Sequence, residues 1–253
     1  MGKNFIVEVC CGSIDDAIEA QRAGADRIEL NSSLFLGGLT PSLGTIMETK
    51  KTLTIPVMVM IRPRSGGFCY TENEIKVMEY DTKAALDCGA EGIVFGILKD
   101  DGRIDEKNCE KIMKIIGDKE AVFHRAFDVV KEPFQALDKL VALGINRVLT
   151  KGQQNTFEEG EELLKELVSY AKGRIEILPG GCRPYNVKRI VRELSFNQVH
   201  VAAFISKKDN SGASRPNIYF GGALRPVEDS YDIANYEYIK NMKDTISMLV
   251  SNE

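Results

Sequence analysis

Eight short apolar segments alternate with helix-length amphipathic stretches along this 253-residue chain. Strands separated by a helix need crossover connections, so the alternation predicts a parallel sheet covered by helices. The predicted strands are residues 5–10, 27–30, 56–61, 92–95, 121–124, 147–150, 175–178 and 198–201. Capping residues and first-turn prolines predict helix starts at Ser13, Pro41, Thr71, Asp105, Pro133 and Thr156.

One helix-to-strand turn occurs three times, at residues 23–30, 88–95 and 143–150. In each copy a glycine ends the helix, one small or apolar residue follows, and a polar pair precedes the strand. This weak repeat indicates stacked βα units. Eight units fit a single-domain TIM (β/α)8 barrel over residues 1–253 better than a doubly wound sheet, which usually has a glycine-rich first turn.

Composition and charge exclude several classes of partner. The net charge of -4 gives no field that would attract nucleic acid, and no apolar run approaches the 18 residues of a membrane span. Six cysteines without a C-x-x-C pair are typical of free thiols in a reducing compartment. We therefore expect a cytoplasmic protein with no nucleic-acid partner, no membrane partner and no organic cofactor.

Polar residues stand at the ends of the predicted strands, where TIM barrels carry their chemistry. The most pronounced change of polarity lies in residues 121–128, where an apolar strand is followed by His124, Arg125 and Asp128. Residues two apart on a strand share a face, so the other strand ends would also point into one site. They supply Glu8, Cys10, Glu29, Asn31, Arg62, Arg64, Thr150, Gly180, Gly181 and His200.

These residue types suit acid/base chemistry on a small anionic ligand. Carboxylates and imidazoles transfer protons, and guanidinium groups bind carboxylates or phosphates. We expect catalytic roles for Glu8, Glu29, His124, Arg125 and His200, and ligand binding by Arg62, Arg64, Asn31, Thr150, Gly180 and Gly181. Lys151 suggests a Schiff base, although a solvated rim lysine is commoner.

Each of these residues also has a purely structural explanation. Glu29 could pair with a neighbouring arginine, and His200 could be a satisfied core imidazole. Cys10 could serve as a small hydrophobe, and Gly180 and Gly181 could form a tight turn instead of a phosphate site. Their joint placement at one end of a barrel favours a functional site.

Seven motifs resemble those of the CutC copper homeostasis family. They read EVC at 8–10, GADRIEL at 24–30, GGLTPS at 37–42, MIRPR at 60–64, FHRAFD at 123–128, RVLT at 147–150 and LPGG at 178–181. The resemblance extends from about residue 4 to residue 203. It implies a cytoplasmic TIM barrel with a role in copper binding or copper tolerance, often a homodimer or a higher homo-oligomer. Its site positions correspond to Glu8, Cys10, Glu29, Arg62, Arg64, His124, Arg125 and His200.

One position of this chain disfavours the binding of Cu(I). Cu(I) prefers two or three thiolate or thioether ligands. Cys10 is the predicted metal ligand, but Asn31 replaces a cysteine that many family members have and that could pair with it. Cys11 should point to the opposite face of the strand. Two hypotheses therefore stay open, namely Cu(I) binding and an enzyme that acts on a phosphorylated or carboxylated small molecule.

The segment of about residues 206–232 is expected to be a long loop before the last helix, which should begin near Ile233. Loops of this length are usually functional or disordered. We expect Ile218, Tyr219 and Phe220 to pack over the barrel mouth or against a second subunit.

Overall fold

The structure, a computed structural model, describes residues 5–194, 196–215, 217–224, 226 and 228–251. The strands of its main sheet are β1 (Ile6–Cys11), β2 (Arg27–Leu30), β3 (Val57–Met60), β4 (Gly92–Phe95), β5 (Glu120–Phe123), β6 (Arg147–Thr150), β7 (Glu176–Pro179) and β8 (Gln198–Val201). They are parallel, in the order β7-β6-β5-β4-β3-β2-β1-β8, and a bridge between Gly180 and His200 joins the two outer strands. This nearly closed barrel confirms the TIM-barrel prediction, and each strand lies within one residue of its expected bounds.

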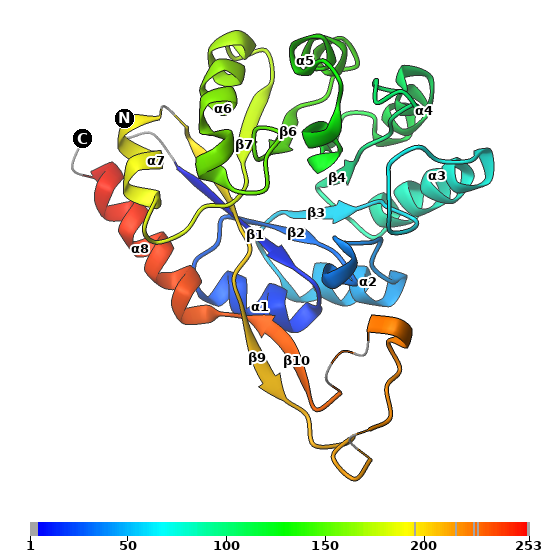
Figure 1. Ribbon diagram of the computed structural model, residues 1–253, viewed down its shortest axis with the longest axis vertical. Helices are drawn as coiled ribbons and strands as arrows, with labels where there is room; N and C mark the ends of the chain where they lie inside the picture. The colour runs from blue at the N-terminus through cyan, green and yellow to red at the C-terminus, as the bar shows by residue number, and fades with distance from the viewer. Residues whose placement is uncertain (1–4, 195, 216, 225, 227, 252–253) are drawn as a thin grey trace.

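Helices surround the sheet on its outer side (Figure 1). They are α1 (Ile14–Arg22), α2 (Leu43–Thr52), α3 (Glu72–Asp87), α4 (Glu106–Ile116), α5 (Pro133–Ala142), α6 (Phe157–Ala171), α7 (Val187–Glu193) and α8 (Tyr236–Ser251). The expected caps Ser13, Thr71, Asp105 and Thr156 each accept a hydrogen bond from a first-turn N–H group. Pro41 instead precedes the actual cap, Ser42. Among the described residues, no helix is both long and apolar enough to cross a membrane.

The interior of the barrel is filled in two layers below the strand ends. The first residues of five strands form a polar network, in which Arg147 donates to Glu120 at 3.0 Å and to Glu176 at 2.7 Å, and Gln198 accepts from Arg27 at 2.9 Å. An apolar layer lies above it, consisting of Met58, Met60, Val94, Val122, Leu149 and Leu178. Together they close the amino-terminal end, so any ligand must enter at the carboxyl ends of the strands.

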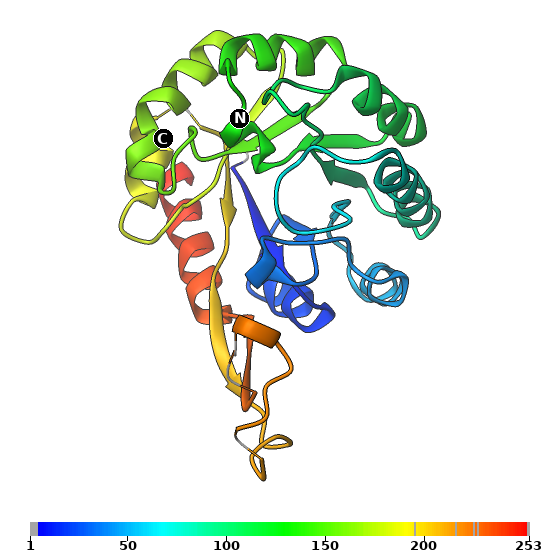
Figure 2. The same ribbon diagram turned by 45° about the vertical axis from the view of Figure 1, so that its right-hand side comes forward.

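The segment of residues 206–232 is partly a hairpin. Strand β9 (Phe204–Lys208) pairs antiparallel with β10 (Ser230–Ala234), and Ile233 lies opposite Ile205 in β10 instead of starting the last helix. Figures 1 and 2 show this hairpin and its connection, the arm, projecting away from the barrel. The arm is attached at its base, where the N–H of Ala234 donates to Asp16 at 2.7 Å.

A close contact between α6 and the loop after β6 yields a stability prediction. A Cβ atom at Gly160 would lie 1.8 Å from the carbonyl oxygen of Lys151. We expect Gly160→Ala to lower the free energy of unfolding by about 1–3 kcal/mol, because the helix must move outward. The control is Gly44→Ala in α2, where a Cβ would meet only Ser42 Oγ at 3.9 Å. This change should stabilise by up to about 1 kcal/mol. Urea unfolding that gives both variants the same sign would contradict the packing.

Candidate functional site

A cavity of about 440 Å³ lies at the carboxyl ends of the strands. Residues of β1, β2, β3, β6, β8 and the segment after β8 form its walls, and the loops after β2, β3 and β5 form its rim. The predicted site residues that line it are Cys10, Glu29, Asn31, Arg62, His124, Arg125 and His200. The cavity therefore collects most of the side chains that the strand ends predicted.

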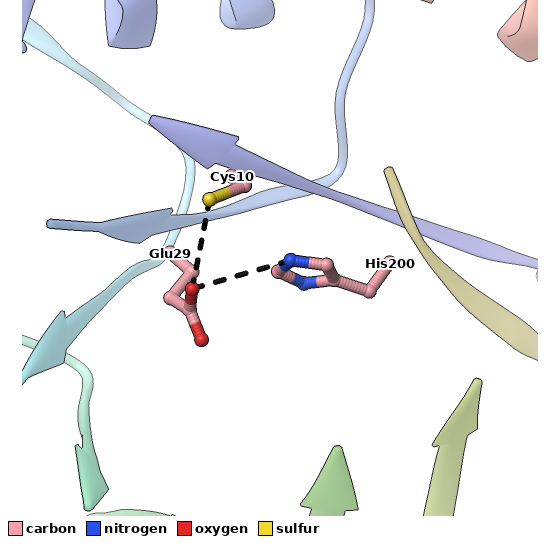
Figure 3. Close-up of side chains that lie close together, drawn as sticks. All are labelled: Cys10, Glu29 and His200. Atoms are coloured by element: carbon pink, nitrogen blue, oxygen red, sulfur yellow. Dashed lines mark hydrogen bonds and ion pairs between the residues drawn. The ribbon is translucent and has the colours of Figure 1, made fainter. Parts of the chain in front are cut away.

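Cys10, Glu29 and His200 bring a thiol, a carboxyl group and an imidazole together on one wall (Figure 3). Cys10 Sγ lies 3.8 Å from Glu29 Oε2, and His200 Nε2 lies 4.0 Å from the same oxygen. Strand register explains the cluster, because Cys10 stands opposite Glu29 on β2 and Glu8 stands opposite His200 on β8. One ligand atom from each of the three lies within 4.8 Å of the others, so a single cation could contact all three.

Glu8 lies beneath this cluster and determines its charge. Its carboxylate accepts a hydrogen bond from His200 Nδ1 at 2.8 Å and forms an ion pair with Arg27. Burial alone would raise the pKa of Glu8, but Arg27 and His200 lower it to about 2. Burial lowers the pKa of His200, yet the nearby Glu29 and Glu8 raise it above its ordinary value. Glu8 is therefore ionised at neutral pH and stabilises the imidazolium form of His200.

Burial favours the protonated form of the other two groups of the cluster. It raises the pKa of Glu29, with a further rise from the charge of Glu8 and an opposing effect of His200. Burial and the charge of Glu29 raise the pKa of the Cys10 thiol well above its usual range. Asn31 Nδ2 donates to Glu29 Oε2 at 2.9 Å and contacts Cys10 Sγ at 3.6 Å. Cys11, as expected, points the other way, into the core beneath the helices.

His124, on another wall, is a neutral hydrogen-bond donor. Its Nδ1 accepts from the N–H of Ala126 at 3.1 Å, so the ring proton resides on Nε2. Burial, together with the positive charge of Arg62, lowers the pKa of His124 to about 3. Nε2 is buried and has no hydrogen-bond partner in the described structure. The imidazole therefore offers an unused N–H group to the cavity.

Arg62 joins two loops at the rim. Its Nη1 donates to the carbonyl oxygens of Leu36 and Gly38, both at 3.0 Å, and its Nη2 donates to Gly66 at 2.7 Å. The guanidinium carbon lies 5.2 Å from the ring centroid of Phe68. These contacts hold the loops after β2 and β3 in place over the cavity.

Asp128 organises the opposite part of the rim. It accepts from Arg125 Nε at 2.6 Å, from Thr150 Oγ1 at 2.5 Å and from the backbone N–H of Lys151 at 3.0 Å. These bonds connect the short helix after β5, η2 (Arg125–Val129), to the loop after β6. The charge of Arg125 is thereby paired within the protein.

Comparison with known proteins decides the family. The CutC family model matches residues 5–205 of this chain. The chain belongs to the CutC family. A CutC family protein from Treponema denticola is 51% identical, over 93% of this chain and 96% of its own. The copper homeostasis protein cutC homolog of Homo sapiens is 40% identical over 94% and 88%. A crystal structure of CutC from Streptococcus agalactiae has a TM-score of 0.74 and 36% identity, covering 78% of this chain and 97% of that chain.

Several residues that the CutC motifs singled out lie outside the cavity lining. Arg64 pairs with Glu74 at 2.5 Å and stacks on Tyr70, with 5.0 Å between the guanidinium carbon and the ring centroid. The N–H of Gly180 donates to the carbonyl oxygen of Thr150 at 2.9 Å, so it is already used. Gly181 and the side chain of Thr150 are likewise absent from the lining, and Glu8 lies directly below it.

Three members of this CutC site were not among the predicted catalytic, binding or metal-ligating residues. Arg27 forms an ion pair with Glu8. The structural explanation taken from the sequence had instead paired a neighbouring arginine with Glu29. The position of Arg27 two residues before Glu29 was the available signal, because both then face inward. Phe68 lies in an irregular loop and had no periodic signal. Asp128 was noticed as part of the motif but not as a lining residue.

The ionised Glu8 leads to a pH-dependent stability prediction. The ordinary pKa of a glutamate carboxyl group is 4.5, and the pKa of Glu8 in the folded protein is about 2. The pairing therefore stabilises the fold above pH 4.5, and the contribution, roughly 3 kcal/mol, is lost as pH falls toward 2. We expect Glu8→Gln to lower the free energy of unfolding at pH 7 and to flatten its decline between pH 4.5 and 2. The raised pKa of His200 has the opposite pH dependence. It stabilises the fold below pH 6.5, the ordinary pKa of histidine, and this stabilisation is lost as the pH rises above the raised pKa.

Urea unfolding of both proteins at pH 7, 4 and 3 measures this effect. The control is Glu120→Gln, since the Glu120 side chain is 47% exposed and its pair with Arg147 is screened by solvent. An unchanged acid profile in Glu8→Gln would show that Glu8 is not the paired carboxylate of the fold.

Proposed function

We propose that this protein takes part in copper homeostasis in the cytoplasm and binds a copper ion at Cys10, Glu29 and His200. The relatives from Homo sapiens and Mus musculus are named copper homeostasis protein cutC homologs. The observation that carries the proposal is the convergence of three ligand atoms within 4.8 Å on the wall of a cavity. The six cysteines are free, which supports a reducing compartment.

The chemistry of these groups fits copper as cargo. Thiolate and imidazole are both ligands that copper accepts, and Cu(I) favours the sulfur. His200 Nε2 is available because Nδ1 is held by Glu8, and a carboxylate in this position orients metal-binding histidines. Copper must replace the protons of Cys10 and His200, whose pKa values are raised. Binding therefore releases protons and becomes tighter as pH rises.

A second candidate function is acid/base catalysis on a small anionic molecule. It is supported by Glu29 Oε1 and His124 Nε2, which belong to cavity-lining residues, are buried and have no hydrogen-bond partner in the described structure. Glu29 would take up or release a proton, while His124 would donate a hydrogen bond to a developing oxyanion. His200 would stabilise the charge of Glu29. Activity that persists in the presence of a strong copper chelator would separate this function from copper binding.

Anaerobic competition against a chromogenic Cu(I) chelator tests the copper site. We expect the reduced protein to bind one Cu(I), and Cys10→Ser to weaken binding at least tenfold because the thiolate is lost. The control is Cys69→Ser, which removes an exposed thiol outside the cluster and should leave affinity unchanged. Affinity should rise with pH between 6 and 8. Failure of the wild type to retain copper, or equal effects of both substitutions, would rule out this site.

We also propose that the protein forms a homodimer or a higher homo-oligomer through the arm. A two-stranded hairpin is marginally stable when it stands alone, and its edges are free to pair. The arm exposes several large apolar side chains, namely Ile205, Ile218, Tyr219, Phe220, Leu224 and Tyr231. A second copy of the chain that covers them would remove this surface from water.

Light scattering after size-exclusion chromatography tests this assembly. Phe220 is 83% exposed and should be part of the interface, so Phe220→Asp is expected to reduce the measured mass to that of a monomer. The control is Tyr80→Asp on α3, which alters a similarly exposed aromatic residue, 75% exposed, away from the arm. A wild-type protein that is monomeric at micromolar concentration would disprove the proposal.

A further inference from the structure

Arg62 differs from most arginines around the barrel because it has no carboxylate partner among the described residues. Arg27, Arg64 and Arg147 each pair with a carboxylate, and Arg125 pairs with Asp128. Arg62 is only 6% exposed, yet its described hydrogen bonds go to neutral backbone carbonyl groups. A buried cation without a counter-ion strongly attracts an anion. The wall formed by Arg62 therefore has a positive charge that the described residues leave unbalanced.

Two hydrogen-bond donors on this side of the cavity are unused. Arg62 Nε and His124 Nε2 are buried and have no partner in the described structure. Both residues line the cavity, and both contact Phe68, whose ring centroid lies 5.2 Å from the guanidinium carbon and 5.0 Å from the imidazole centroid. A buried donor without a partner costs about 1–3 kcal/mol, which a ligand can recover. The two donors thus belong to residues that both contact Phe68 at the border of one cavity.

Two acceptors of residues that line the same cavity are also unused. Glu29 Oε1 and Asn31 Oδ1 are buried and unpartnered in the described part of the chain. They stand on β2 and directly after it, whereas Arg62 and His124 directly follow β3 and β5. A ligand in the cavity would therefore meet hydrogen-bond donors at Arg62 and His124 and acceptors at Glu29 and Asn31.

We propose that the cavity binds a small hydroxycarboxylate, with its carboxylate at Arg62 and His124 and its hydroxyl groups toward Glu29 and Asn31. This deepens the second candidate function by naming its ligand class, and it does not depend on copper. Two N–H donors match the two oxygens of a carboxylate. A phosphate dianion offers three oxygens and a larger charge, and the Gly180 N–H that could serve it is already bonded to Thr150. The volume of about 440 Å³ accommodates a molecule of this size.

Histidine NMR provides a direct test, because the chain has only two histidines and their ring signals can be assigned by substitution. The reduced, metal-free full chain is titrated with D-gluconate, with D-sorbitol and with inorganic phosphate. Sorbitol has the same chain of hydroxyl groups but no carboxylate. We expect gluconate to saturate and to shift the His124 ring signals, while sorbitol at the same concentration leaves them unchanged. Equal shifts by sorbitol, stronger binding of phosphate, or no shift with gluconate would each overturn the proposal.

Substitution of two arginines localises the carboxylate. Arg62→Met should weaken gluconate binding at least tenfold, whereas Arg64→Met should not, because Arg64 belongs to the same loop but lies outside the cavity lining. If Arg62→Met fails to fold, His124→Gln provides the second variant and is expected to weaken binding at least fivefold. Equal effects of the two arginine substitutions would place the anion elsewhere.

A parallel Cu(I) titration separates this inference from the copper proposal. Cys10→Ser should weaken copper binding at least tenfold, and Arg62→Met should weaken gluconate binding at least tenfold. Copper binding without gluconate binding would overturn the ligand inference alone. Gluconate binding without turnover of any hydroxycarboxylate would support the inference while counting against the catalytic function.

Discussion

The buried carboxylate of Glu8 is the interaction on which the site depends. It pairs with Arg27 on β2 and accepts a hydrogen bond from His200 on β8, and its own strand lies between them. An isolated charge at this depth would be strongly destabilising, so its partners must stay close. His200 also pairs with Gly180 at the point where the sheet closes. Closure of the barrel and ionisation of the cluster are therefore connected through one residue, His200.

The cavity has two walls of opposite character. One wall, from β1, β2 and β8, holds Cys10, Glu29 and His200, which can accept a cation after losing protons. A second group of lining residues, Arg62 and His124, carries a fixed positive charge and a neutral N–H donor. Copper binding and carboxylate binding, as proposed, would share Glu29 and otherwise use different side chains of one cavity. A cation on the first wall and an anion on the second would attract each other across it.

Hydrogen bonds between loops make the rim rigid. Arg62 connects the loop after β2 to the loop after β3, and Asp128 connects η2 to the loop after β6. Each connection uses a side chain that directly borders the cavity. A rim held in this way lowers the ordering cost of binding a small ligand.

Several local features were predictable because they depend on neighbouring residues. The alternation of strands and helices, the glycine turns and the caps at Thr71 and Thr156 require only the adjacent sequence. The inward direction of Glu29, His124 and His200 followed from strand periodicity. The parallel barrel, and a polar end to it, therefore came from the sequence itself.

Tertiary structure decided which of these polar groups act together. Glu8 and His200 are 192 positions apart, and only strand register brings them within 2.8 Å. Arg62 and Arg64 look equivalent in sequence, yet Glu74 engages Arg64 outside the cavity lining while Arg62 faces it with only neutral partners. The arm depends on pairing between β9 and β10 across a long connection. The sequence by itself determined the barrel and the polarity of its mouth. Charge pairing, burial and strand register depend on residues that are far apart in the sequence. Only the folded chain could therefore determine which side chains of the site act together.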